Sequence, residues 1–98
     1  MSVTEGPPQT EPAIDLDRPW HLHPQVALRD ESFGALAYHY GTRRLHFLKS
    51  RVLVDVVTAL PKFDSATAAV ASMVPSEEQA RYRSALAGLA ASGVLHVA

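Results

Sequence analysis

The chain has 98 residues, with ten acidic side chains against nine basic ones, and 47% of its residues are hydrophobic. This length provides one small domain, and the near-neutral charge argues against a nucleic-acid binder, which usually has a strongly basic surface. There is no cysteine, which excludes a disulfide scaffold, a thiolate metal site and a cysteine nucleophile. The N-terminal segment has no secretory signal pattern and no apolar run could span a membrane, so we expect a cytoplasmic protein without membrane or nucleic-acid partners.

Residues 1–18 differ in composition from the remainder of the chain. They contain four acidic residues, three prolines and one glycine, and few large apolar side chains. A segment of this kind buries too little apolar surface to offset the entropy that it would lose on ordering. We therefore predict a disordered N-terminal tail over residues 1–18, which could act as a tether or docking peptide, and a folded domain over residues 19–98.

The folded part is predicted to begin with β-structure. Residues 20–29 alternate between polar and apolar side chains, which predicts a short first strand that is interrupted at Pro24. The stretch from Phe33 to Lys49 is interpreted as a β-hairpin with a loop over residues 41–44. An isolated two-stranded hairpin is only marginally stable in water, so another part of the chain must cover one of its faces.

The hydrophobic period changes from two to 3.6 after the hairpin, which predicts helices. The first helix spans about residues 51–60, with Ser50 as its N-cap. A second, short helix is capped by Asp64 or Ser65 and ends before Pro75. The apolar faces of these two helices are predicted to contain Leu53, Val56, Val57, Leu60, Ala66, Ala69, Val70 and Met73.

A third helix is predicted from Ser76 to Ser92. Ser76 and Gln79 form a capping-box pattern at its start, and Gly93 fits the position that follows its last turn. Residues 94–97 are short and apolar, which predicts either a packing stub or a terminal strand. The buried stripe of the third helix is predicted to contain Tyr82, Ala85, Leu86, Leu89 and Ala90.

No residue pattern in the chain indicates catalysis. The serines that precede the helices are interpreted as caps, and the chain has no nucleophile elbow, dinucleotide-binding glycine motif or phosphate-binding loop. Among the five histidines, His21 and His23 would share one face of a strand, but the histidine spacing matches no zinc motif, so solvated or capping roles are favoured. We expect a protein that is not an enzyme and that holds no cofactor or metal.

Positive charge is predicted to gather around the second arm of the hairpin and the third helix. The residues concerned are His39, Arg43, Arg44, His46, Lys49, Arg81 and Arg83. They form either an ordinary solvated surface or a positive rim beside a sheet edge that suits an acidic peptide. Glu77 and Arg81 are spaced by one helical turn, which predicts a modest ion pair.

The order of these segments resembles that of the PqqD-type peptide-recognition domains, or RiPP recognition elements, and within them the mycofactocin peptide chaperones. The resemblance covers residues 19–98 and is carried by VALRDESFGALAYHYGTRRLHFL, LVDVVTAL and SALAGLAASGVL, with FGALAYHYGTRRLHFLKS as the most specific part. It implies an α+β fold, namely a small winged helix-turn-helix-like domain in which a three-stranded antiparallel sheet is followed by three helices.

The resemblance also implies a function as a non-catalytic peptide chaperone. Such domains bind the leader of a ribosomally made precursor peptide and present it to a radical SAM maturase, which for mycofactocin decarboxylates and cross-links the C-terminal Val-Tyr pair of the precursor. The leader adds as a strand to the third strand and lies in the groove beside the third helix. On this chain the implied peptide-binding residues are Arg44, Leu45, His46, Phe47, Leu48, Lys49, Tyr82, Arg83 and Leu86.

Two other classes of function are compatible with the sequence. A winged-helix DNA-binding regulator would share the implied fold, but the third helix balances two acids against two bases from Glu77 to Arg83, which makes a poor reader of the major groove. A module that serves only for oligomerisation is the third candidate. Mixing the protein with the precursor peptide that is encoded beside it would separate the three.

Overall fold

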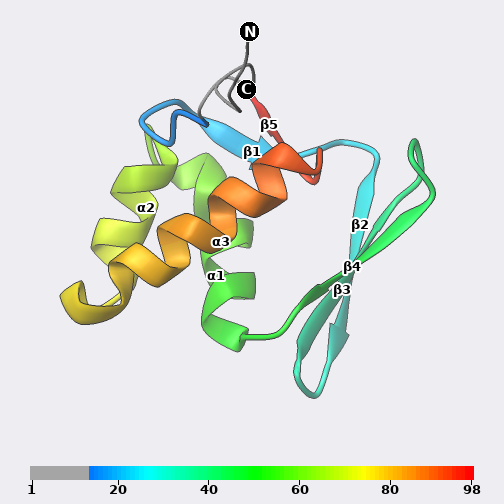
Figure 1. Cartoon of the computed structure of the whole chain (residues 1–98), viewed down its shortest axis with the longest axis horizontal. Helices are drawn as coiled ribbons and strands as arrows, with labels where there is room; N and C mark the ends of the chain where they lie inside the picture. The colour runs from blue at the N-terminus through cyan, green and yellow to red at the C-terminus, as the bar shows by residue number, and fades with distance from the viewer. Residues whose placement is uncertain (1–13) are drawn as a thin grey trace, which may run out of the picture.

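The computed structural model describes residues 14–98, which form two small sheets and three helices (Figure 1). The strands are β1 (Trp20–Leu22), β2 (Val26–Glu31), β3 (Gly34–His39), β4 (Arg44–Leu48) and β5 (Leu95–Val97). The helices are α1 (Arg51–Ala59), α2 (Ala66–Met73) and α3 (Gln79–Ala91), with 3-10 turns at Leu60–Lys62 and Ser76–Glu78. The predicted α+β class, with a three-stranded antiparallel sheet and three helices, is confirmed. None of the helices in this part of the chain has the length and apolar character needed to cross a membrane.

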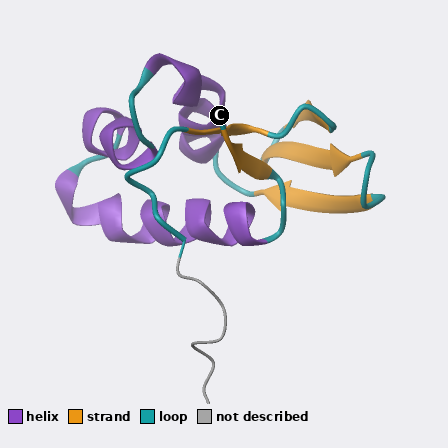
Figure 2. Ribbon diagram, turned by 90° about the horizontal axis from the view of Figure 1, so that it is seen from above, coloured by secondary structure: helices purple, strands orange, loops and turns teal. Residues whose placement is uncertain are grey.

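Strands β2, β3 and β4 form an antiparallel meander, and the three helices gather to one side of it (Figures 1 and 2). The hairpin predicted between Phe33 and Lys49 is present, with β3 paired to β4 and a four-residue connection that ends at Arg43 with a positive φ of 62°. Successive side chains of a strand point to opposite faces, so each strand has one set of residues toward the core and one set away from it. The core set of β3 and β4 includes Ala35, Ala37 and Leu48, which are fully buried.

The predicted first strand is in fact two strands that belong to different sheets. The interruption at Pro24 was predicted, but β1 pairs with the C-terminal β5, and only β2 joins the hairpin. His23 N donates to Val94 O at 2.8 Å and Ala98 N donates to Pro19 O at 2.8 Å, so hydrogen bonds flank the β1–β5 pair at both ends. The fold therefore gains a two-stranded sheet that the sequence did not predict, and the C-terminal residues form a strand.

Side-chain caps begin the first two helices, as predicted. Ser50 Oγ accepts a hydrogen bond from Leu53 N at 3.2 Å, and Ser65 Oγ accepts one from Ala68 N at 3.0 Å. Each cap satisfies a backbone donor that has no partner within the helix. Every predicted apolar position of α1 and α2 is buried except Met73, which is half-buried.

The start of α3 differs from the prediction because the chain forms a 3-10 turn there. Ser76 begins this turn and makes no side-chain cap, since its hydroxyl lies 3.4 Å from a carboxylate oxygen of its neighbour Glu77. Gln79 also turns away from the predicted capping box, and its side-chain amide donates to Val74 O at 2.9 Å. The helix therefore begins three residues later than predicted, at Gln79.

The ion pair of α3 differs from the prediction, whereas the end of this helix agrees with it. Arg81 pairs with Glu78 at 2.8 Å and not with Glu77 as predicted, because the helix that carries Arg81 begins only after the turn. Gly93 follows the helix with a φ of 86°, a conformation that glycine adopts without strain, so its predicted role is confirmed.

One core joins the helices to both sheets. The predicted stripe of α3 faces this core, with Tyr82 and Leu86 buried and its other members partly buried. The largest fully buried side chains are Leu48, Leu60, Leu86, Leu95, Val56, Val57, Val70 and Val94. These side chains come from α1, α2, α3, β4 and the segment around β5, and the same cluster includes Val26, Ala35 and Ala37, so the core joins the helices to strands from both ends of the described chain.

The predicted N-terminal tail falls mostly on residues 1–13, which lie outside the described residues. The last five residues of the predicted tail are described, and they run along the N-terminus of α2. Leu16 O and Arg18 O accept hydrogen bonds from Thr67 N at 3.0 Å and Ala66 N at 3.2 Å, and Leu16 packs against the core. Contacts with the domain therefore begin before residue 19, the start of the domain in the prediction.

Candidate functional site

The outer edge of β4 is open. Within residues 14–98, β4 forms strand hydrogen bonds only with β3 and lies at the margin of its sheet. An open strand edge presents unpaired N–H and C=O groups to which another extended chain can bond. β4 is also short and consists of the residues that the sequence analysis selected for peptide binding.

Hydrogen bonds in the loops determine which residues of β4 present their backbone to this open edge. Tyr40, which follows β3, donates its N–H to Gln25 O before β2 at 2.8 Å. Backbone groups alternate in direction along a strand, so the even-numbered residues of β3 direct theirs toward β2. Odd-numbered residues of β3 therefore bond to β4, which pairs Ala37 with His46 through backbone hydrogen bonds. The intervening residues of β4, Leu45 and Phe47, direct their N–H and C=O groups to the open edge.

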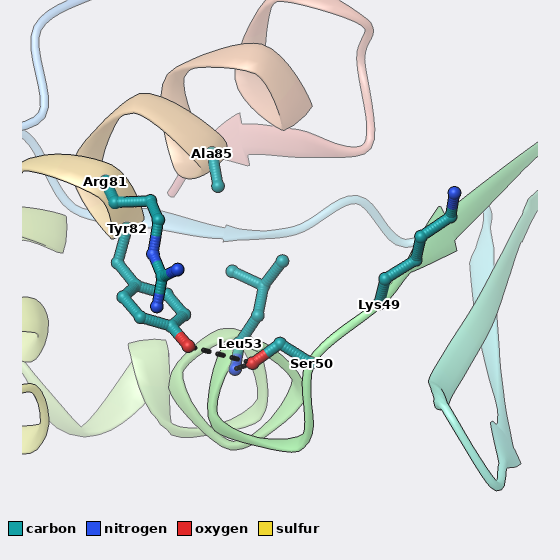
Figure 3. A pocket seen from close by; sticks show the side chains of 6 residues that line it. All are labelled: Lys49, Ser50, Leu53, Arg81, Tyr82 and Ala85. Atoms are coloured by element: carbon teal, nitrogen blue, oxygen red, sulfur yellow. Dashed lines mark hydrogen bonds between the residues drawn. The ribbon is translucent and has the colours of Figure 1, made fainter. Parts of the chain in front are cut away.

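An open pocket of about 450 Å³ lies between the end of β4 and α3 (Figure 3). Its lining residues are Lys49 and Ser50 after β4, Leu53 from α1, and Arg81, Tyr82 and Ala85 from α3. The hydroxyls of Tyr82 and Ser50 lie 2.9 Å apart in a hydrogen bond, and Ser50 also caps α1. This pair of bonds fixes the link after β4 against both helices, so the pocket has a constant position relative to the strand edge.

The pocket combines an apolar floor with positive charge at its margins. Arg81 lies over the ring of Tyr82, 5.2 Å from its centroid, and forms the ion pair with Glu78 described above. Lys49 Nζ lies 6.0 Å from the centroid of the Phe47 ring, and none of the three ion pairs among the described residues involves this lysine. A ligand with an apolar side chain and a nearby carboxylate fits this combination of charges.

The structure brings part of the predicted site together. Residues 44–48 form the edge strand, and Lys49 and Tyr82 line the adjoining pocket. The side chains of Leu48 and Leu86 are fully buried, so they support the site from the core without facing a ligand. Two predicted residues therefore have a structural role at this site.

The pocket also includes residues that the sequence analysis did not assign to the site. Arg81 lines it, whereas the predicted Arg83 does not, because two residues along a helix correspond to a rotation of about 200°. Ala85 follows Arg81 at the i,i+4 spacing that places two side chains on one helix face, and this spacing is the signal that could have found it. Ser50 and Leu53 were predicted only as a cap and a core residue, and nothing in their local sequence indicates a second role.

His46 has a polar atom without a partner in the described structure. Its side chain points to the core face of β4 and is half-buried, and its Nε2 is covered but makes no hydrogen bond. An unsatisfied buried polar group costs about 1–3 kcal/mol. The core face of β4 therefore contains one buried nitrogen that has no hydrogen-bond partner among the described residues.

Three other histidines form a cluster where the two sheets meet. The ring centroid of His23 lies 4.7 Å from that of His39 and 5.1 Å from that of His96. The buried His39 accepts hydrogen bonds at Nδ1 from Gly41 N at 3.0 Å and Thr42 N at 3.2 Å, which hold the loop before β4. Partial burial, followed by positive charge on the two neighbouring rings, lowers the pKa of His23 below its usual value. Over residues 14–98, no group of three or more histidines and carboxylates is arranged to hold a metal.

An open strand edge beside a pocket with an apolar floor is the kind of site found in small peptide-binding domains. Comparison with known families matches residues 19–96 to the peptide chaperone MftB family. The chain belongs to this family.

Curated relatives agree with this assignment. The chain is 50% identical to the peptide chaperone MftB of Mycobacterium ulcerans (strain Agy99) over 84 residues, which cover 85% of this chain and 77% of the relative. It is 49% identical over 83 residues to the proteins of the same name from Mycolicibacterium smegmatis and Mycobacterium tuberculosis, covering 84% of this chain and 81% and 76% of the relatives. No solved structure matches significantly. The predicted resemblance and the role of a non-catalytic peptide chaperone are confirmed by these comparisons.

Proposed function

We propose that this chaperone binds the leader of the mycofactocin precursor peptide as an added strand on β4 and presents it to a radical SAM maturase. The observation that supports this proposal is the pair of outward-facing backbone positions at Leu45 and Phe47, on an edge with no partner strand within residues 14–98. Main-chain hydrogen bonds at these positions would supply affinity, and side-chain sites at the edge would supply specificity. Processing of the precursor's C-terminal Val-Tyr pair would then take place on the maturase.

The pocket beside β4 is the natural place for one leader side chain. Its floor of Leu53, Ala85 and the Tyr82 ring accepts an apolar group, and Lys49 and Arg81 attract a neighbouring carboxylate. We infer a leader segment in which an acidic residue stands close to an apolar one. This segment would lie in the groove between β4 and α3. We also propose that the fold is a winged helix-turn-helix-like recognition domain, in which this groove is the place of peptide binding.

A titration with the fluorescently labelled, synthetic leader of the precursor peptide tests this function. We expect a dissociation constant of about 0.1–10 μM, which corresponds to about −7 to −9.5 kcal/mol. A scrambled leader of the same composition is the matched control and should not bind. Addition of the maturase and full-length precursor should then give a modified peptide only when this chaperone is present.

The salt dependence of the same titration separates the two sources of affinity. Backbone hydrogen bonds and apolar contacts are weakly affected by salt, whereas exposed charges are screened over about 10 Å at 0.1 M ionic strength. We expect the affinity to fall only modestly between low and moderate salt, because Arg43, Arg44 and Arg83 act mainly in steering. A collapse of binding over this range would contradict strand addition as the principal interaction.

The same anisotropy assay also tests the alternative of a DNA-binding regulator. We propose no DNA-binding role, because the family is one of peptide chaperones, and we expect no change in the anisotropy of a labelled DNA duplex. Binding of duplex DNA with an affinity similar to that for the leader would favour the regulator. The absence of membrane partners and the cytoplasmic location also remain predictions.

A further inference from the structure

The outer face of the three-stranded sheet, on the side away from the core, is rich in large apolar side chains. Its members are Phe33, Leu36, Tyr38, Tyr40, Leu45 and Phe47. All are exposed or half-buried, whereas Ala35, Ala37 and Leu48 on the opposite face are fully buried. We call these six residues the outer apolar face. A concentration of this kind on a small domain usually marks an interaction surface.

The two members nearest the open edge are Leu45 and Phe47. Their side chains are 51% and 57% exposed, and the Phe47 ring contacts Phe33 at a centroid distance of 5.9 Å. The same two residues direct their backbone groups outward from β4. One residue pair therefore offers both hydrogen-bonding groups and apolar side chains to a strand that adds at this edge.

The outer apolar face is too small for a stable contact with a second copy of this chain. Its members lie only on β3, β4 and the residues that flank them, because the same face of β2 carries Ala27, Arg29 and Glu31, so the apolar strip is two strands, or roughly 10 Å, wide. A stable interface buries about 800 Å² on each partner. A single added strand, by contrast, needs only the row of side chains along the edge, and that row is continuous with the proposed leader site.

We propose that the leader carries apolar side chains at alternate positions that pack on Leu45 and Phe47, so that it is recognised on both faces of the sheet. This inference rests on the strand addition proposed above. Alternate side chains of an added strand must point to opposite faces. The residues on one face enter the groove beside α3, and those on the other cover the edge row of the outer apolar face. A leader with this pattern is selected at two surfaces, not only in the groove.

Serine substitutions at the edge row test this inference with the labelled synthetic leader as probe. Leu45→Ser and Phe47→Ser should each weaken binding about two- to five-fold, the usual worth of a cross-strand apolar pair, and the double variant about ten-fold. Tyr40→Ser is the matched control, because Tyr40 is 61% exposed on the same face but its backbone bonds toward β2, away from the edge. The control should bind the leader normally.

Substitutions in the leader avoid any question about folding of the protein. In the leader, serine is placed at the alternate positions whose side chains would pack on Leu45 and Phe47. This change should weaken binding to the unchanged protein, but it should not weaken binding further in the Leu45→Ser/Phe47→Ser double variant. Equal losses in both proteins would overturn the inference. Sedimentation of the free protein gives a further test, because a dimer that dissociates in the double variant would mean that a second copy covers this face.

The failure of this inference differs from the failure of the proposed function. If both serine variants bind normally but Phe47→Pro does not, strand addition is correct and the leader makes no contact on the outer face. If Phe47→Pro also binds normally, the leader does not add to β4 and both proposals are wrong.

Discussion

Proline substitutions at two adjacent residues of β4 should have opposite effects. Proline removes one backbone donor and fixes φ near −65°, which strands tolerate only where the amide is not needed. In this protein His46 N faces β3 within the backbone pairing with Ala37, whereas Phe47 N faces the open edge. His46→Pro should therefore break the sheet, and Phe47→Pro should leave it intact.

The expected magnitudes follow from these two environments. His46→Pro loses one ladder hydrogen bond and leaves the carbonyl of the fully buried Ala37 unsatisfied, at about 1–3 kcal/mol, and steric conflict of the ring with the paired strand adds to this. In a domain with about 5–10 kcal/mol of total stability, such a loss lowers the melting temperature by many degrees or unfolds the protein. Phe47→Pro loses no ladder bond, so we expect a melting temperature within a few degrees of the unchanged protein.

Phe47→Pro should lose leader binding although it remains folded. Phe47→Pro removes a hydrogen bond to the leader worth about 0.5–1.5 kcal/mol and places a ring at the edge, so affinity should fall by more than ten-fold. Phe47→Ser is the control for loss of the aromatic side chain, and it should bind more tightly than Phe47→Pro because it retains the amide. Thermal melts by circular dichroism and anisotropy titrations give both quantities.

Two results would refute this reasoning. A folded His46→Pro together with an unfolded Phe47→Pro would mean that the outward-facing residues of β4 are the even-numbered ones. Two folded variants that both bind the leader normally would rule out strand addition at this edge.

Further predictions concern the core, the unsatisfied histidine and the histidine cluster. Leu86→Ala should lower the free energy of unfolding by about 2–5 kcal/mol in denaturant titrations because Leu86 is fully buried, whereas Ser84→Ala on the exposed side of α3 should change it little. His46→Leu should raise the melting temperature of the free protein by several degrees, since it removes a buried nitrogen that has no partner, and unchanged or lower stability would show that this atom is satisfied in solution. Because the folded protein lowers the pKa of His23 below 6.5, its contribution to stability is present above about pH 6.5 and is lost as the pH falls through that value toward the lower folded pKa. Melts of His23→Asn, whose side-chain oxygen can still accept the Gln25 amide, should show a flatter dependence between pH 7 and 5 than the unchanged protein.

Local sequence was sufficient for the features that depend on neighbouring residues. The hairpin, the serine caps of α1 and α2 and the glycine after α3 each follow from spacing and turn chemistry within a few residues. The capping box at Ser76 did not form, although its pattern was present. The competing 3-10 turn, closed by a hydrogen bond from Glu78 N to Pro75 O at 2.9 Å, used the same residues in a tighter geometry. Propensity alone does not decide between two turns of similar local stability.

The candidate site also has one part that local sequence predicted and one part that it did not. The edge strand was predicted because it is one continuous segment, but the pocket joins residues that are about 30 positions apart. Ser50 and Tyr82 are connected by a single hydrogen bond between their hydroxyls, and no local pattern links them. Arg81 replaced Arg83 as the lining residue because the rotation of α3 about its axis is fixed by the burial of Tyr82 and Leu86.

The sequence by itself determined the α+β class, the hairpin, the helices and the resemblance to peptide chaperones, because these depend on periodicity and on a continuous stretch of residues. Only the tertiary structure decided that β1 leaves the main sheet to pair with β5, and which residues of β4 turn their backbone to the open edge. Strand partners and backbone direction depend on hydrogen bonds between distant segments, such as that from Tyr40 to Gln25, and a one-residue shift in register would exchange every inward and outward group.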